Sequence, residues 1–141
     1  MSEKNSEPKR LKGFAGVMAK QLEPVNNVQR FKERFKEYND FKLLINANDG
    51  KYAALIKINR GNLTVDGIKN DDKAIMKNLK KECEGFLEMT TDLFFELAMG
   101  KLSNAAFAKN WFTRKIKMKG MKNVMILTKL FYYLSDQTKK E

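Results

Sequence analysis

The stretch that most constrains this fold is residues 88–131. It reads in order as a strand end, a capped helix, a Gly-Lys-Leu break, a second short helix, a lysine-rich strand and an apolar closing helix. The closing helix, about residues 121–134, is apolar nearly all round, so it must be buried on more than one side. This order predicts two apolar helices beside a sheet, with few polar groups between them, which favours holding an apolar ligand over converting it.

The composition predicts one domain at residues 11–134, between a flexible tail at 1–10 and a charged tail at 135–141. Of 141 residues, 43% are hydrophobic, enough for one packed core. No apolar run approaches the roughly 20 residues that cross a bilayer, and residues 2–12 are too polar for a secretory signal. A single cysteine, Cys83, excludes an internal disulfide and fits a reducing compartment, so we expect a cytoplasmic protein.

The first two thirds of the chain predict two helices followed by an antiparallel meander. Apolar residues recur at helical spacing over residues 11–23, and an amphipathic helix of about four turns is predicted over residues 25–38. Alternating runs then predict three strands, which begin near Phe41, Tyr52 and Leu63 and are separated by short turns. Residues 70–81 read as a surface helical connection.

The last third predicts two strands and three helices. Residues 82–89 alternate as a fourth strand, with Cys83 inward and Phe86 as an exception on the acidic face. Helices follow over residues 92–99 and about 104–109, each after a hydroxyl residue that suits an N-cap. A fifth strand is predicted over residues 113–119 and the closing helix over residues 121–134.

The absence of histidine argues against catalysis. It removes the commonest general base, the usual partner of Ser and Cys nucleophiles and a frequent zinc ligand. Glu82, Glu84 and Glu88 alternate on one strand, a pattern more typical of a solvated sheet face than of a metal site. We therefore predict no enzymatic activity, no metal and no cofactor.

The positive charge is concentrated at one end of the chain. Of the net charge of +11, residues 101–141 carry +8. A basic patch attracts phosphates of nucleic acid, anionic lipid or a coenzyme. A solvated lysine-rich face would have the same composition, so both interpretations stay open.

Soft sequence motifs in residues 41–131 follow one another in a fairly specific order. Met89-Thr90 leads into a helix start and then into Gly100-Lys101-Leu102. Ser103-Asn104 and Ala106-Phe107 follow, and then the lysine-rich strand Lys115-Ile116-Lys117-Met118-Lys119-Gly120. In this order the motifs resemble a sterol carrier protein type 2 domain, which has a similar lysine-rich strand. The helix at residues 25–38 resembles the family's N-terminal helix, whereas Thr113-Arg114 departs from its usual Gln-Gly step.

The resemblance implies an α+β fold, in which a mixed five-stranded sheet with helices packed on one face encloses a hydrophobic tunnel. It implies non-catalytic binding and transfer of a fatty acid, fatty acyl-CoA, phospholipid or sterol-like lipid. The predicted lipid-binding residues are Phe94, Leu97, Leu102, Phe107, Trp111, Phe112, Met118, Met125 and Phe131. The predicted head-group or membrane contacts are Arg114, Lys115, Lys117, Lys119 and Lys122.

Two alternatives remain at this stage. A basic nucleic-acid-binding protein would use the lysine-rich strand, but that strand pairs its lysines with Ile116 and Met118 rather than with stacking aromatics. An accessory subunit would present lipid to a separate partner enzyme. Residues 11–22 would suit either an anionic membrane surface or, as we prefer, packing against the sheet.

Overall fold

The computed structural model describes residues 13–139, with side chains to Leu134. The predicted tail at 1–10 lies outside the described residues. The strands are β1 (Phe41–Ala47), β2 (Tyr52–Asn59), β3 (Asn62–Lys69), β4 (Gly85–Met89) and β5 (Lys117–Lys119). The helices are α2 (Gly13–Leu22), the 3-10 helix η1 (Glu23–Asn27), α3 (Gln29–Arg34), α4 (Lys73–Glu82), α5 (Thr91–Ala98), α6 (Asn104–Phe112), α7 (Met121–Val124) and α8 (Ile126–Lys139).

The five strands form one mixed sheet in the order β3-β2-β1-β4-β5. β1, β2 and β3 are the predicted antiparallel meander, in which Leu43 lies opposite Ile56 and Ile56 opposite Val65. β4 pairs parallel to β1 and antiparallel to β5. The predicted α+β class and mixed five-stranded sheet are confirmed.

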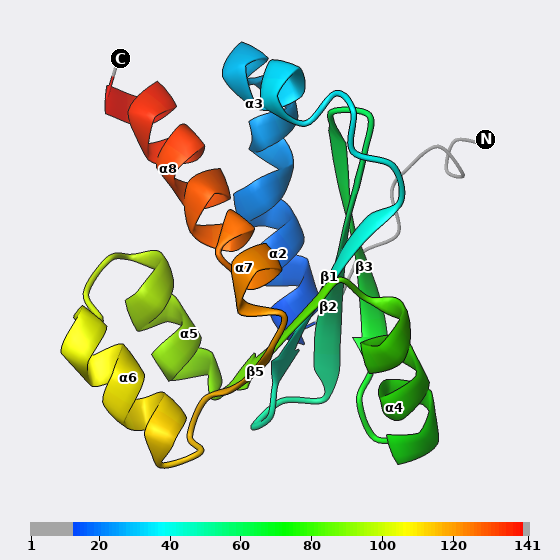
Figure 1. Cartoon of the computed structure of the whole chain (residues 1–141), viewed down its shortest axis with the longest axis vertical. Coiled ribbons are helices and arrows are strands. Elements are labelled where there is room, and N and C mark those ends of the chain that lie inside the picture. The colour runs from blue at the N-terminus through cyan, green and yellow to red at the C-terminus, as the bar shows by residue number, and fades with distance from the viewer. Residues whose placement is uncertain (1–12, 140–141) are drawn as a thin grey trace.

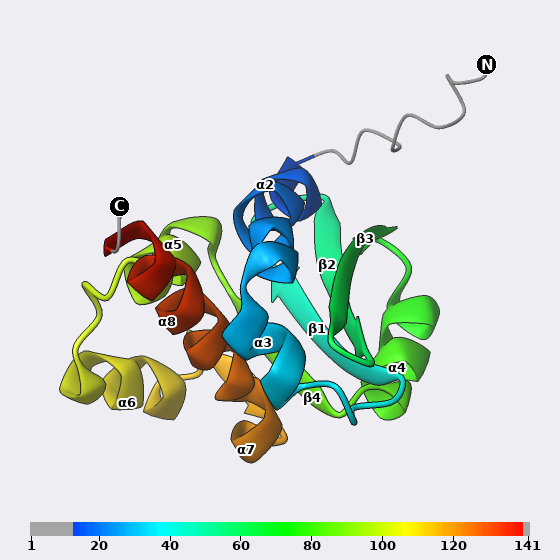
Figure 2. The ribbon, with the colours of Figure 1, turned by 90° about the horizontal axis from the view of Figure 1, so that it is seen from above.

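The main core lies between one sheet face and the helices α2, η1, α3 and α8 (Figures 1 and 2). α2 contributes its apolar stripe, including Met18 and Leu22, to this core against β2 and β3. The apolar face of α2 therefore packs against the sheet, as the preferred interpretation of residues 11–22 predicts. Among the described residues, no helix is both long and apolar enough to cross a bilayer.

A second, smaller cluster lies on the opposite sheet face under α4, which Figure 1 shows on the far side of the sheet from α8. Phe86 is buried there, and the Lys80 ammonium lies 4.5 Å from the centre of its ring. This explains the apolar exception on the acidic face. The fourth strand begins at Gly85 rather than at residue 82, because Cys83 caps the C-terminus of α4. Cys83 is thus half-buried beside the small cluster, and the prediction that it lies on an inward strand face is wrong.

The predicted continuous helix at residues 25–38 is also wrong. Val28 adopts an extended conformation between η1 and α3. The side chain of Asn26 accepts a hydrogen bond from Leu63 N (2.7 Å) and donates one to Leu63 O (2.9 Å). These bonds hold the chain against β3 where a straight helix would leave the sheet. The apolar side chains Val25, Phe31 and Phe35 are nevertheless buried as the pattern predicts.

The boundary between α6 and β5 differs from the prediction as well. α6 continues to Phe112, and the backbone amides of Lys115 and Ile116 both donate to Asn110 O, at 2.8 and 3.0 Å. Arg114 has φ = 68°, so residues 113–116 form a turn and β5 contains only three residues. The closing helix is divided at Met125 into α7 and α8, and α8 runs past its predicted end to Lys139.

Candidate functional site

The α5–α6 hairpin, residues 91–112, is the part of the chain on which the candidate site is built. Each helix begins at a hydroxyl cap: Thr90 Oγ1 accepts from Leu93 N (3.3 Å), and Ser103 Oγ accepts from Ala106 N (3.1 Å). The hairpin projects to one side of the sheet in Figure 1. α6 has no fully buried residue and α5 has only Phe94, so little of the hairpin is anchored in the core.

A small cavity, called here the inner cavity, lies between the hairpin, β4 and the α7–α8 segment. Its volume is about 130 Å³. Seven of its nine lining residues are apolar, and the polar ones are Asn104 and Thr128. The Thr128 hydroxyl donates to Met125 O (2.7 Å). The lining residues are Leu87, Leu97, Leu102, Asn104, Phe107, Val124, Met125, Leu127 and Thr128.

A second hollow is an apolar groove of about 540 Å³, called here the α2–α8 groove. Its lining residues are Gln21, Phe95, Ala98, Met99, Phe131 and Leu134. Phe94 does not line this groove and belongs to the main core, where it is only 1% exposed. Its ring stacks edge-on against Phe14 at 5.2 Å and lies 6.2 Å from Phe131. Phe94 is therefore a core residue that ties α5 to α2 and α8.

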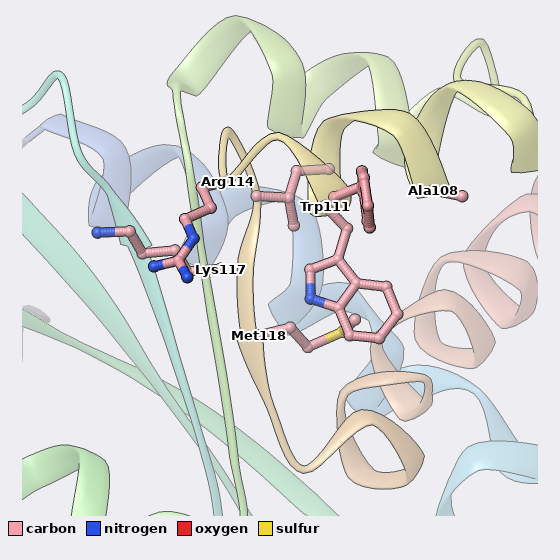
Figure 3. Close-up of a pocket in the computed structure, with 7 residues that line it drawn as sticks. Ala108, Trp111, Arg114, Lys117 and Met118 are labelled. Atoms are coloured by element: carbon pink, nitrogen blue, oxygen red, sulfur yellow. The ribbon is translucent and has the colours of Figure 1, made fainter.

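The third hollow, the Trp111 hollow, lies between the end of α6 and β5 and measures about 660 Å³. Figure 3 shows the Trp111 ring beside the Met118 side chain, while Arg114 and Lys117 extend to the opposite side. The lining residues are Ala108, Trp111, Phe112, Arg114, Ile116, Lys117 and Met118. Apolar groups therefore form one side of this hollow and cations the other.

Eight of the nine predicted lipid-binding residues are divided among three hollows rather than lining one continuous tunnel, and the prediction that Phe94 lines it is wrong because Phe94 is buried in the core. The inner cavity has Leu97, Leu102, Phe107 and Met125; the Trp111 hollow has Trp111, Phe112 and Met118; and the α2–α8 groove has Phe131. Five lining residues of the inner cavity were not predicted, and two of them, Leu87 and Asn104, lie on β4 and at the start of α6. The other three are Val124, Leu127 and Thr128. Their i, i+3, i+4 spacing places them on one helical face, a signal that a closing helix apolar nearly all round conceals.

The predicted head-group cations are also divided. Arg114 and Lys117 line the Trp111 hollow, and the Lys117 ammonium lies 3.8 Å from the Glu88 carboxylate. Lys115 instead faces a polar depression that contains Asp92 and Glu96, because it precedes β5. Lys122 lies beside Arg34 and Lys129, and Lys119 is exposed on β5.

In the part of the chain that the structure describes, the pKa values of two groups, Asp49 and Cys83, are shifted, and both shifts have structural explanations. The backbone N–H of Thr91 donates to Asp49 Oδ1 (2.9 Å) and lowers the pKa of that carboxyl. Burial raises the pKa of the Cys83 thiol to about 11, which disfavours the nucleophilic thiolate at neutral pH. Within residues 13–139, no group of three or more Cys, Asp or Glu is placed to hold a metal ion.

Comparison with known proteins finds similarity in structure only. No family model and no curated protein sequence matches the chain. A conserved hypothetical protein from Thermus thermophilus, named as a candidate sterol carrier protein, has a TM-score of 0.51 at 10% identity, over 86% of this chain and 88% of that one. The ubiquinone synthesis protein UbiJ-SCP2 gives a TM-score of 0.48 at 8% identity, over 84% of this chain and 88% of its own.

A larger protein contains a similar segment. The stereoselective inverting sec-alkylsulfatase Pisa1 from Pseudomonas sp. matches with a TM-score of 0.50 and 17% identity over 85% of this chain. The match spans only 15% of the sulfatase chain. Similarity at such low identity concerns the fold and not the activity. The sheet order, the helix arrangement and the Thermus structure together show that this chain has an α+β fold similar to that of a candidate sterol carrier protein.

Proposed function

We propose that this protein binds a lipid-like ligand without catalysis and transfers it, as sterol carrier proteins do. The observation that carries the proposal is the inner cavity, which places apolar side chains of β4, α5, α6 and α8 around one space in this fold. Burial of an acyl chain there would supply about 0.8 kcal/mol per CH₂ group before ordering costs. Asn104 and Thr128 would orient a polar end of the ligand.

The cavity must widen to accept a whole lipid. Ligand pockets usually measure about 300–1,000 Å³, and the inner cavity has a volume of about 130 Å³. The α5–α6 hairpin forms one wall, and Phe94 is its one fully buried residue. We expect the ligand to enter by displacing this hairpin, because few buried contacts are lost when it moves.

The ligand class is inferred from the positive charge of the C-terminal third of the chain, because no cation lines the inner cavity itself. Arg114, Lys115, Lys117, Lys119 and Lys122 would favour an anionic lipid whose head group lies outside that cavity: a fatty acid, a fatty acyl-CoA or a phospholipid, with a sterol-like lipid as the uncharged case. The carrier would deliver this ligand to an anionic membrane surface or present it to a partner enzyme. The lack of histidine supports a carrier over an enzyme.

The basic nucleic-acid-binding alternative is less favoured. β5 has only three residues, and its inward side chain, Met118, is apolar. Binding of DNA or RNA with a steep dependence on salt would support that alternative.

Native mass spectrometry of the purified protein, followed by solvent extraction, tests the proposal. We expect a discrete added mass that extracts as a fatty acid, phospholipid or isoprenoid. A bare mass, in a protein that also fails to take up a fluorescent fatty acid, would contradict lipid binding.

The site is tested by Met125→Lys. Met125 is 49% exposed at the edge of the inner cavity, so the folded protein tolerates an ammonium there while the apolar cavity does not. Met121→Lys is the matched control, since Met121 is 44% exposed in the same segment and does not line that cavity. Ligand loss in the first variant alone supports the site. Equal retention in both would exclude it. Phe94→Asp is unsuitable because it would place a charge in the core.

A further inference from the structure

The end of α6 exposes two aromatic residues that the hydrophobic core does not use. The Phe112 side chain is 90% exposed and Trp111 is 43% exposed. Both were predicted to line a tunnel, but the last turn of α6 instead carries them to the surface beside β5. Exposed large apolar groups that adjoin one another mark an interaction surface.

We propose that this surface, residues 108–119, docks the protein on an anionic lipid bilayer, with Phe112 and Trp111 entering the interface between head groups and acyl chains. The inference deepens the proposed function and rests on it for its purpose, since a carrier must exchange its ligand at a membrane. Trp and Phe suit this depth because their rings are large and apolar.

Three of the last four backbone carbonyls of α6 already accept hydrogen bonds, which lowers the cost of entry into a lipid interface. Lys109 O accepts from Thr113 N (3.0 Å), Trp111 O accepts from Arg114 N (3.1 Å), and Asn110 O accepts from Lys115 N (2.8 Å) and Ile116 N (3.0 Å). These carbonyls at the helix C-terminus therefore do not need water. The left-handed turn at Arg114 makes this closure possible.

The charge around the rings complements an anionic membrane. No acidic residue lies between Glu96 and Asp136, whereas this stretch carries eight Lys and Arg residues. Lys109 precedes Phe112 by one helical turn, and Arg114 lines the same hollow as both rings. The nearby acids lie on other elements: Glu88 faces Lys117, and Asp92 and Glu96 share a depression with Lys115.

A bilayer explains these features better than a nucleic acid does. Adjacent helical residues point about 100° apart, so Trp111 and Phe112 do not form a row of parallel ring faces for successive bases. The hollow beneath them contains Ile116 and Met118, which suit acyl chains.

The single tryptophan of the chain reports on docking directly. Full-length protein is titrated with vesicles of phosphatidylcholine alone, and with vesicles of equimolar phosphatidylcholine and phosphatidylserine. We expect Trp111 emission to shift to shorter wavelength, and the protein to co-sediment, with the anionic vesicles only. Phe112→Ser should lower the partition coefficient of the protein onto the anionic vesicles about tenfold or more. Ile75→Ser removes an exposed side chain on α4, across the sheet, and should leave it unchanged.

The charge contribution is measured with Lys109→Gln and Arg114→Gln. Each should lower the partition coefficient about fivefold, whereas Lys77→Gln on α4 should not. A wild-type protein that ignores anionic vesicles would overturn the proposal. A Phe112→Ser variant that binds anionic vesicles as tightly as the wild-type protein would also overturn it. The same holds if the wild-type protein prefers duplex DNA to vesicles and the Phe112→Ser variant still binds that DNA.

The two proposals fail separately. Copurified lipid without vesicle docking would leave the inner cavity in place and remove the docking surface. Vesicle docking by a protein that carries no bound lipid in native mass spectrometry would support the docking surface and contradict ligand binding in the inner cavity.

Discussion

The meander β1–β3 with its covering helices and the α5–α6 hairpin use their apolar residues in opposite ways. Over the meander, Leu22, Phe31 and Phe35 are fully buried. In the hairpin, Phe94 alone reaches that state, and apolar side chains from Leu97 to Phe112 line hollows or face solvent. The first region concentrates the stability of the fold, and the second leaves room that a ligand or a membrane can occupy.

This division has a physical basis. Segments with few buried apolar contacts open at a low free energy, and ligand-binding elements are commonly drawn from them. The hairpin is held by the buried Phe94, by partly buried apolar side chains that pack against the core and by Asp49. The Asp49 carboxylate accepts from Thr91 N and Thr91 Oγ1, both at 2.9 Å. Substitutions in the two regions should therefore have unequal effects.

The largest expected effect comes from truncating matched phenylalanines. Phe31→Ala removes a fully buried ring and should lower the free energy of unfolding by about 3–5 kcal/mol. Phe107→Ala, in the half-buried hairpin position, should cost about 1–2 kcal/mol because its site is already partly open. Urea denaturation measures both. Equal losses would show that the hairpin belongs to the same packed core.

Two glycines with the same backbone conformation give the next effect. Gly100 and Gly120 have φ = 73° and 70°. Gly100→Ala should cost about 1 kcal/mol from conformation alone, because its added methyl group would have nothing within 4 Å. Gly120→Ala should cost about 2–3 kcal/mol, because the methyl group would collide with the Glu84 carbonyl oxygen. If thermal unfolding showed no difference, the β4–β5 contact would be as loose as the hairpin loop.

The smallest effect concerns Asp49. Asp49→Ala should cost about 1 kcal/mol and reduce hydrogen-exchange protection at the start of α5, while leaving β1 and β2 protected. The carboxyl pKa is lowered in the folded protein. Its contribution is therefore present above the unfolded pKa and is lost as the pH falls through the lowered value. Wild-type α5 should then lose protection in acid, whereas a variant already lacking Asp49 should change less. Acid-insensitive wild-type exchange would contradict this role.

Periodicity predicted most of the fold because it depends on local patterns of burial. Apolar residues recur at every second position in Leu43 and Ile45 of β1 and in Leu63 and Val65 of β3, and these residues lie in the main core. The stripe Val25, Phe31, Phe35 requires burial even where the helix itself is interrupted. The predictions from periodicity failed where contacts between residues distant in the sequence changed the local structure. Asn26 bonds to Leu63, 37 residues away, and this bond interrupts the predicted helix.

The candidate site was predictable only in part. The apolar residues from Leu97 to Met125 were identifiable by type, and four of the nine predicted lining residues meet in the inner cavity. The positions of Trp111 and Phe112 could not be predicted in this way. Asn110 O accepts hydrogen bonds from the amides of Lys115 and Ile116, and α6 extends about one turn beyond its predicted end. That extension carries both rings out of the interior.

The sequence by itself determined the class of fold, the basic C-terminal third and the lack of histidine chemistry, since these follow from residue types and their spacing. Only the tertiary structure decided that the apolar residues separate into three hollows, that Lys115 leaves the row of Lys117 and Lys119, and that Phe112 faces outward. These outcomes depend on which distant segments come into contact. A pattern of apolar residues along the sequence predicts which residues are buried, but it does not predict those contacts.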